Sequence, residues 1–264
     1  MNLSNDATAN RTLDVAREAQ AAPATALQDS IQTSNGSKFA PLVALRALRE
    51  LVADPEDTSK VFVILRALSG KSIHRAYRRF LKTPIAPEVL SDPGSLIDHL
   101  RDREALRALP ADSLGRAYLA FVERENISAD GLVDASTQDQ RFADPGLQKF
   151  AERQRDMHDL WHVLTQYGRD SFGEVCLLAF TFAQTYNPGI AAIALVGGVK
   201  TSQELGQGVW RAVLRGFTDG QRSAWLPGIH WETMLAQPLD EVRTELRIQS
   251  PIPYQTVWAS ARAA

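Results

Sequence analysis

Two histidines four residues apart are the part of this sequence best suited to chemistry. His158 and His162 stand in the run His-Asp-Leu-Trp-His. In a helix, a spacing of four puts both imidazoles on one face, about one turn apart. Two imidazoles placed in this way can chelate one metal ion. The alternative is a pair of hydrogen-bonded histidines beside a hydrophobic core, and the pair alone leaves both interpretations open.

Asp159, inside the same run, argues against one class of metal enzyme, the zinc peptidases. The zinc-peptidase motif His-Glu-x-x-His has the same spacing but uses its glutamate as a general base, and Asp159 is one methylene shorter than that glutamate. Peptidase chemistry is therefore disfavoured. Asp159 lies about 100° around the helix from His158. It is either a third ligand or a group that orients one.

Glu174 is the candidate for a further oxygen ligand, twelve residues beyond His162. It follows a helix break expected at Gly168, after which the next helix can turn back toward the imidazoles. The alternative is a capping box, in which the Glu174 carboxylate accepts a hydrogen bond from the Ser171 amide. The sequence leaves ligand and cap open.

Taken together, these residues form a longer pattern. The string is His158-Asp159-x-x-His162, eleven residues and Glu174, and two stretches accompany it, residues 109–118 with Phe121 and residues 231–232 followed by 241–246. Over roughly residues 80–250, this pattern resembles the Coq4 family of coenzyme Q (ubiquinone) biosynthesis proteins.

The resemblance implies a function as well as a fold. It implies an all-α protein with a divalent metal, most often zinc, held by His158, Asp159, His162 and Glu174. It also implies a polyprenylated substrate, a polyprenyl hydroxybenzoate that loses its C1 carboxyl group while a hydroxyl is installed at that carbon. The protein would then be an oxidative decarboxylase, a carbon-carbon lyase. Members of the family are also linked to organising the other coenzyme Q enzymes.

Two other functions are compatible with the residues. One is a non-catalytic scaffold that binds polyprenyl lipids and the other coenzyme Q enzymes. The second is an HD-type phosphohydrolase, which also uses a His-Asp pair but needs a further upstream histidine and a downstream aspartate. The upstream candidates are His74 and His99, and neither stands in a recognisable partner motif.

The elements that must position these residues are expected to be helices. Apolar residues recur at spacings of three and four, without long alternating runs, which predicts an all-α fold. Residues 61–65 are the exception, since this apolar run can equally be a buried strand. We expect helices over residues 41–53, 55–70, 71–82, 95–109, 113–125 and 145–167, another from residue 171, shorter ones within 189–247, and a loop over 130–144.

The first 38 residues contain few large apolar side chains. Such a segment buries too little apolar surface to offset the entropy lost on ordering. We therefore expect a disordered tail over residues 1–38 and one helical domain over residues 39–264.

Charge and cysteine content exclude several classes of protein. The 29 basic and 31 acidic residues give a net charge of -2, so nucleic acid is not an expected partner. Cys176 is the single cysteine and cannot form an internal disulfide or a cysteine-built zinc site. It lies in an apolar run typical of a core residue. A reducing interior follows as the default location.

Two further features point toward a lipid substrate. Residues 175–199 carry no charge, but the polar residues 184–189 interrupt them, which predicts a buried helical hairpin rather than a membrane span. Such a hairpin is either ordinary core or one wall of a groove for an isoprenoid tail. A basic stripe suited to anionic lipid is formed by Lys71, Arg75, Arg78, Arg79 and Lys82.

These features set the expected surroundings of the protein. We expect it to bind peripherally to the inner face of the cytoplasmic membrane, or to the matrix side of the mitochondrial membrane in a eukaryote. The expected partners are a polyprenylated benzoate or quinone precursor, the membrane surface, other coenzyme Q proteins and a second copy in a homodimer.

Overall fold

The predicted all-α fold is confirmed over the part of the chain that the structure, a computed structural model, describes. These residues are 71–127 and 142–263, with 40, 42–44, 46, 47, 50, 67 and 68. They form helices and no strand. The predicted tail over residues 1–38, the run over 61–65, and most of the loop expected at 130–144 lie outside the described residues. The division into a tail and one domain stays a prediction.

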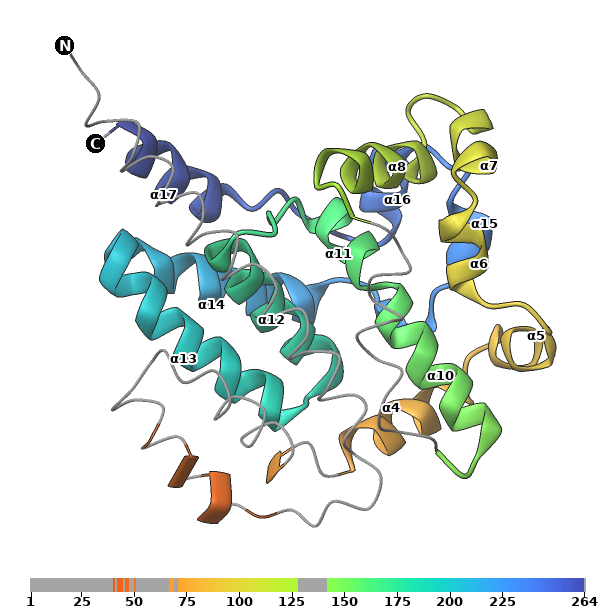
Figure 1. The fold of residues 1–264 in the computed structure, drawn as a ribbon, viewed down its shortest axis with the longest axis horizontal. Helices are drawn as coiled ribbons and strands as arrows, with labels where there is room; N and C mark the ends of the chain where they lie inside the picture. Colours follow the sequence, from red (N-terminus) through yellow and green to blue (C-terminus); the bar gives the residue numbers. More distant parts are fainter. Residues whose placement is uncertain are drawn as a thin grey trace.

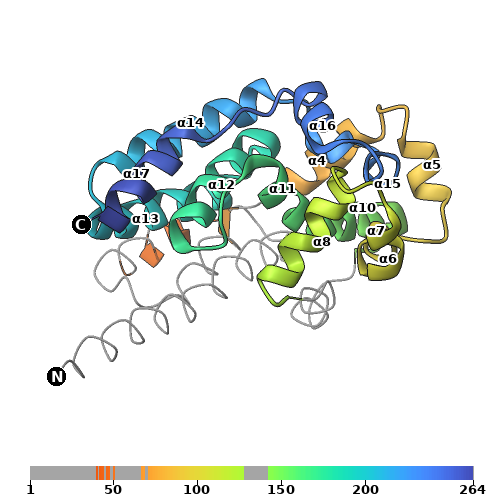
Figure 2. The same cartoon turned by 90° about the horizontal axis from the view of Figure 1, so that it is seen from above.

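One half of the molecule is built around α12, and Figures 1 and 2 show its neighbours beside it. α12 is apolar on nearly all sides and almost wholly buried, as expected for a central helix. With α13 it forms the predicted hairpin, although Leu195 and Val199 of α13 are exposed. The helices of this half are α12 (Ser171–Thr185), α13 (Pro188–Leu205), α14 (Gly208–Arg222) and α17 (Ile252–Ala263).

The contact between α12 and α14 depends on two glycines. A Cβ atom on Gly216 would lie 2.6 Å from the Cys176 carbonyl oxygen, and one on Gly220 would lie 2.6 Å from that of Phe180. Both distances are shorter than real Cβ contacts, so only glycine allows this approach. Gly216 and Gly220 are one turn apart, as are the two carbonyls they face.

The other half consists of α10, α11 and the shorter helices that adjoin them, and in Figure 1 α5, α6 and α7 lie on the far side of α10 and α11 from α12. α10 and α11 bring the histidine run into the core. The helices are α4 (Ser72–Phe80), α5 (Ala86–Ser91), α6 (Leu96–Arg101), α7 (Arg103–Ala108), α8 (Leu114–Arg124), α10 (Pro145–Asp156), α11 (His158–Thr165), the 3-10 turn η1 (Leu226–Gly228), α15 (Trp231–Met234) and α16 (Leu239–Glu245).

Three predicted helix boundaries are wrong. The helix expected over residues 95–109 is two helices, because the Asp102 carboxylate accepts the Ala105 amide and starts α7. The helix expected over 145–167 is also two helices, α10 and α11, which meet at Met157, and the Met157 side chain is fully buried. The helices expected to be short within 189–247 include α13 and α14, with 18 and 15 residues, which stay long because they pack along α12.

The predicted core position of Cys176 gives a first testable expectation. The thiol is fully buried in α12, and burial, followed by the charge of Asp170, raises its pKa well above the ordinary value. Because the thiolate is the reactive form, we expect native protein at pH 8 to resist a disulfide reagent such as DTNB for hours. Protein unfolded in guanidinium should release one equivalent within minutes. Rapid stoichiometric reaction of the native protein would contradict the buried position.

Candidate metal centre

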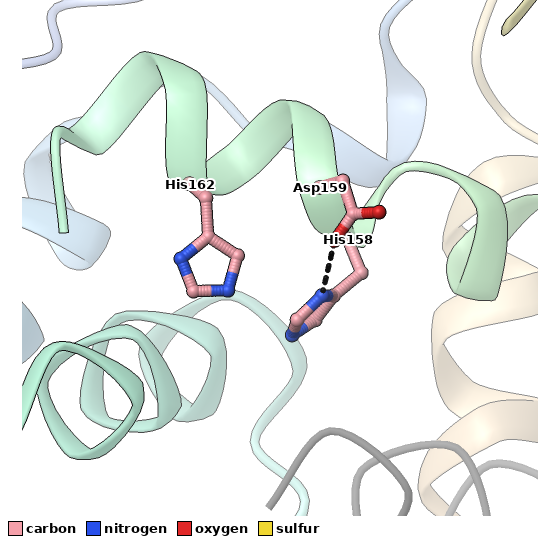
Figure 3. A group of neighbouring side chains, drawn as sticks. All are labelled: His158, Asp159 and His162. Carbon is pink, nitrogen blue, oxygen red and sulfur yellow. Dashed lines mark hydrogen bonds and ion pairs between the residues drawn. The ribbon is translucent and has the colours of Figure 1, made fainter. Parts of the chain in front are cut away.

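The two imidazoles lie on one side of α11, as their spacing predicts (Figure 3). Their ring centroids are 4.8 Å apart, with the planes at 74°. Both side chains are buried, with 5% of His158 and 1% of His162 exposed. A buried pair of imidazoles must have its nitrogens paired or bound to a metal, because unpaired polar atoms are costly in the interior.

One nitrogen of each ring is held by an acceptor. His162 Nδ1 lies 3.0 Å from the Tyr167 carbonyl oxygen, and because a carbonyl only accepts, Nδ1 must be the donor. His158 Nδ1 lies 3.3 Å from Asp159 Oδ1, and Figure 3 shows this contact as a dashed line. In the neutral form of both rings, the lone pair is then on Nε2. This pairing is typical of metal-binding histidines, where it fixes the ring and its tautomer.

Glu174 brings its carboxylate to the two Nε2 atoms. Glu174 Oε1 lies 3.3 Å from His162 Nε2, and Oε2 lies 3.9 Å from His158 Nε2. Two ligands of a tetrahedral zinc ion are about 3.3 Å apart, given metal-ligand distances of about 2.0 Å. His162 Nε2 and Glu174 Oε1 nevertheless have no hydrogen bond of acceptable geometry in the described structure. These two buried atoms are in ion-pair contact but share no hydrogen bond, and a divalent cation bound by both fits this arrangement.

The alternative capping role of Glu174 does not match the start of α12. Asp170 is the residue before the first turn, and its carboxylate accepts a hydrogen bond from the Gly173 amide at 2.8 Å. Ser171 therefore already lies inside the helix. The Glu174 carboxylate is left to face the imidazoles, as the ligand interpretation requires.

The turn between α11 and α12 sets the position of Glu174. α11 ends at Gln166, which takes a left-handed conformation with φ 62°. The first turn of α12 then packs so tightly on Gly168 that a Cβ atom on Gly173 would lie 2.1 Å from the Gly168 carbonyl oxygen. The Tyr254 hydroxyl accepts a hydrogen bond from the Gly168 amide at 3.0 Å and donates one to the Asp170 carboxylate at 2.8 Å. These two bonds connect α17 to this turn.

Arg243 of α16 binds the C-terminal end of α11, the helix that carries the two histidines. Its guanidinium donates to the carbonyl oxygens of Val163 at 2.9 Å and Leu164 at 3.1 Å. These carbonyls are in the last turn of α11, where helix carbonyls lack partners of their own and attract positive charge. The stretch that contains Arg243, which accompanies the histidine string in the sequence, therefore supports α11.

The charges of the site stabilise one another. Burial is the largest single influence on the pKa of His162 and lowers it, but the contacts with Glu174, Asp159 and the Tyr167 carbonyl together outweigh it, and the net pKa is raised. Burial is also the largest single influence on the pKa of Asp159 and raises it, but His158, His162 and Arg169 together outweigh it, and the net pKa is lowered. The raised pKa of His162 means that protons and a metal compete for this imidazole.

Three of the four predicted residues form a group by distance alone. One ligand atom from each of His158, Asp159 and His162 lies within 4.8 Å of the others, and all three residues are buried. Asp159 contacts Nδ1 of His158, the side of the ring away from Glu174, as expected for a group that orients a ligand. The upstream histidines of a phosphohydrolase are not in this group, since His74 packs on Phe142 and His99 is exposed on α6.

Two features near the site were not predicted. Arg153, which is 4% exposed, donates to both carboxylate oxygens of Glu232 and holds α15 against α10, just before the histidine run. Glu232 belongs to a stretch that the sequence singled out, but nothing in the sequence pairs it with Arg153. The second feature is a pocket beside His158, lined in part by Gln154, Trp161 and Thr181. Only the spacing of four between Gln154 and His158 hints at it.

Comparison with known proteins gives three results. The profile of the family described as "Coenzyme Q (ubiquinone) biosynthesis protein Coq4" matches residues 28–252. The chain is 29% identical over 181 residues to the mitochondrial ubiquinone biosynthesis protein COQ4 of Podospora anserina, covering 68% of this chain and 58% of that protein. Against the mitochondrial coq4 protein of Aspergillus flavus, the identity is 30% over 181 residues, covering 68% and 61%.

The matched segment thus spans less than two thirds of the length of these two relatives. A solved structure supports the fold independently. It is a crystal structure from Nostoc punctiforme of a protein given a provisional role in ubiquinone biosynthesis, with a TM-score of 0.57. That comparison covers 81% of this chain and 100% of the other, at 22% sequence identity, and it shows likeness of fold alone.

Proposed function

The chain belongs to the Coq4 family of coenzyme Q (ubiquinone) biosynthesis proteins, and from this premise we propose that it removes the C1 carboxyl group of a polyprenyl hydroxybenzoate. A hydroxyl is installed at the same carbon. The site is the group His158, His162 and Glu174, with Asp159 orienting His158. The observation that carries the proposal is the buried pair His162 Nε2 and Glu174 Oε1, which face each other without a hydrogen bond.

The overall reaction is an oxidation. The aromatic acid and one water become a phenol and carbon dioxide, with release of two protons and two electrons. Dioxygen is the proposed electron acceptor, and the two electrons and two protons convert it to hydrogen peroxide. A divalent metal held by these residues, with zinc the metal most often implied by the family resemblance, would supply a Lewis acid for the substrate carboxylate or phenolate.

The residues of the chain contribute position and charge. Glu174 and the two Nε2 atoms hold the cation, while Asp159 and the Tyr167 carbonyl keep both rings in the orientation that exposes Nε2. Burial of all four side chains excludes water, which strengthens each electrostatic contact on the reacting ring. The positions of these side chains support positioning and charge stabilisation as the main contribution of the protein.

Release of carbon dioxide tests this function. The substrate is a polyprenyl hydroxybenzoate with ¹³C at the carboxyl carbon, presented in detergent under air. We expect labelled carbon dioxide and a hydroxylated ring from metal-loaded protein, no turnover after chelation, and recovery on adding metal back. Lipid that binds normally but is never turned over, with every metal tried, would contradict the enzyme and favour the scaffold.

The polyprenyl tail is expected at the exposed apolar surface of the predicted hairpin. Leu195 and Val199 are one turn apart on α13 and are 58% and 48% exposed. Large apolar side chains that are exposed together often mark a binding surface. None of the helices in the described part of the chain combines the length and the hydropathy needed to cross a bilayer.

The basic stripe of α4 is the proposed contact with the membrane surface. All five of its residues, Lys71, Arg75, Arg78, Arg79 and Lys82, are exposed. Arg75 also donates to the Tyr186 carbonyl oxygen at 3.4 Å, and Arg79 stacks on Trp225 at 4.3 Å, so both help to fix α4. We place the protein peripherally on the inner face of the membrane, or on the matrix side in a eukaryote, with other coenzyme Q proteins and a second copy of the chain as partners.

Vesicle binding tests the stripe. Each basic residue near an anionic bilayer contributes about 1 kcal/mol, so Lys71→Gln with Arg78→Gln should weaken binding to anionic vesicles roughly tenfold after screening by salt. The measurement is co-sedimentation with vesicles that contain 30% phosphatidylglycerol, and with neutral vesicles. Arg211→Gln with Arg222→Gln, on α14, is the matched control. Equal binding by the two double variants would show that the basic stripe is an ordinary solvent-exposed face with no role in membrane binding.

A further inference from the structure

A small pocket lies beside His158, on the side where α4, α10, α11 and α12 meet. It has a volume of about 30 Å³. This space is enough for one carboxylate group or about two water molecules. Most of its lining is buried, and the partly exposed Ala76 and Thr185 mark its outer end. The lining residues are Ser72, Ile73, Ala76, Gln154, His158, Trp161, Thr181, Thr185, Asn187 and Ile190.

Three polar atoms around this pocket have no hydrogen-bond partner in the described structure. They are Gln154 Nε2, Trp161 Nε1 and Thr181 Oγ1, from α10, α11 and α12. The three side chains are 8%, 3% and 5% exposed. Buried polar atoms are nearly always paired, and a buried tryptophan N–H usually finds an acceptor. Three unpaired groups around one pocket therefore indicate that something absent from the structure normally pairs with them.

Thr181 differs from its helical neighbours in a way that supports this conclusion. The Thr165 hydroxyl donates to the Trp161 carbonyl oxygen at 2.6 Å, and the Thr185 hydroxyl donates to the Thr181 carbonyl oxygen at 2.9 Å. This bond to the preceding turn is the ordinary way in which a buried threonine in a helix is satisfied. Thr181 does not make it, so its hydroxyl is available to the pocket.

The unpartnered polar groups that line the pocket are donors, so they favour a ligand that accepts hydrogen bonds. A tryptophan N–H can only donate, the Gln154 atom without a partner is the amide nitrogen, and a hydroxyl can donate as well. Among the described residues that line the pocket, His158 is the only ionisable one, so no carboxylate among them competes for these donors. Hydrogen bonds to a charged acceptor are about twice as strong as those between neutral groups.

We propose that this pocket binds the carboxylate of an aromatic acid, with Thr181, Trp161 and Gln154 as its donors and His158 at its edge. These three are positioning residues that orient the acid next to the metal centre. The identity of the ligand as the substrate acid rests on the proposed function, whereas the donor pocket itself rests on the unpartnered atoms alone.

The test is binding of 4-hydroxybenzoate, which carries the acid without the polyprenyl tail, measured by isothermal titration calorimetry on metal-free and zinc-loaded protein. Thr181→Val keeps the shape of the side chain and removes the donor. We expect its Kd to rise about tenfold, the effect of one lost hydrogen bond to a charged group, and Thr181→Ser to restore binding. The melting temperature of Thr181→Val should be unchanged or higher, because an unpaired buried hydroxyl has been removed.

Thr165→Val is the matched control, since it removes an equally buried hydroxyl that already has a partner. It should lower the melting temperature and leave the Kd unchanged. 4-Hydroxybenzamide, which is neutral, should bind at least tenfold more weakly to wild type than the acid. A Kd that Thr181→Val does not change, or equal binding of acid and amide, would overturn the proposal and leave ordered water as the partner of these donors.

The two proposals fail separately. If the acid binds through Thr181 but no carbon dioxide is released by any metal-loaded form, the donor pocket stands and the decarboxylase does not. If the labelled substrate is turned over but Thr181→Val matches wild type in Kd, KM and kcat, the decarboxylase stands and the pocket is water-filled.

Discussion

Replacing Glu174 by glutamine is expected to lower the affinity for a divalent metal at least a hundredfold with little change in the fold. Glutamine keeps the length of the side chain but removes the negative charge that faces His162 Nε2 at 3.3 Å. Zinc content after equilibration with a buffered zinc solution, measured by elemental analysis, should fall from about one equivalent per chain to below about 0.2. His158→Ala with His162→Ala should lose the metal as completely.

Asp219→Asn is the control for removal of a buried carboxylate. Asp219 is 4% exposed and pairs with Arg215 on α14, away from the histidines. It should affect stability and leave the zinc content unchanged. Full zinc occupancy in folded Glu174→Gln would show that Glu174 is not a metal ligand. Full occupancy in the double histidine variant would contradict the proposed metal site as a whole.

Gly173→Ala is expected to cost about 3 kcal/mol of the free energy of unfolding and to weaken the metal site as well. The new Cβ atom would lie 2.1 Å from the Gly168 carbonyl oxygen and 2.7 Å from two further backbone atoms of Gly168. Backbone cannot move aside as a flexible side chain can, so the cost falls at the upper end of overpacking. The melting temperature should drop by roughly 6–12 °C for a chain of this size.

The same change tests how Glu174 is positioned. Because Gly173 and Glu174 share the first turn of α12, displacing that turn from Gly168 moves the carboxylate away from the imidazoles. We expect zinc content to fall in the population that remains folded. Gly94→Ala is the control, since a Cβ atom there meets only the Asp92 side chain, at 3.3 Å and beyond. A Gly173→Ala variant as stable and as zinc-loaded as wild type would contradict the tight turn.

Local patterns in the sequence were sufficient for features that depend on neighbours in the chain. The spacing of four in His158 and His162 puts the rings on one side of α11, since helix geometry alone determines that relation. The apolar run of residues 175–199 with its polar interruption was enough for the α12–α13 hairpin. The buried position of Cys176 also followed from its apolar neighbours.

Helix boundaries were less predictable because they depend on caps and on packing. Apolar spacing continues through Asp102 and through Met157, so the sequence predicts one helix where the structure has two. The break at Asp102 comes from a side-chain cap that competes with the helix, and the one at Met157 comes with burial of its side chain in the core. Neither signal changes the periodicity on which the prediction rested.

The position of the Glu174 carboxylate depends on tertiary structure. From the sequence, cap and ligand were equally compatible, because both require only that a helix begin near Ser171. Whether the carboxylate reaches His162 depends on the direction in which α12 leaves the turn, and Gln166, the Gly168–Gly173 contact and Tyr254 together set that direction. These contacts join residues up to 86 positions apart, and no local pattern encodes them.

The pocket beside His158 is the clearest case of what only the tertiary structure decided. Its three unpartnered donors come from three helices, and each residue is unremarkable in its own segment. An unpaired hydroxyl, amide or indole N–H is a property of the surroundings rather than of the residue type, because it exists only when packing has removed water and supplied no acceptor. The sequence by itself named His158, Asp159, His162 and Glu174 as the candidate ligands, because residue type and helical spacing are local properties. The packing of α10, α11 and α12 decided which atoms beside them were left without a hydrogen-bond partner.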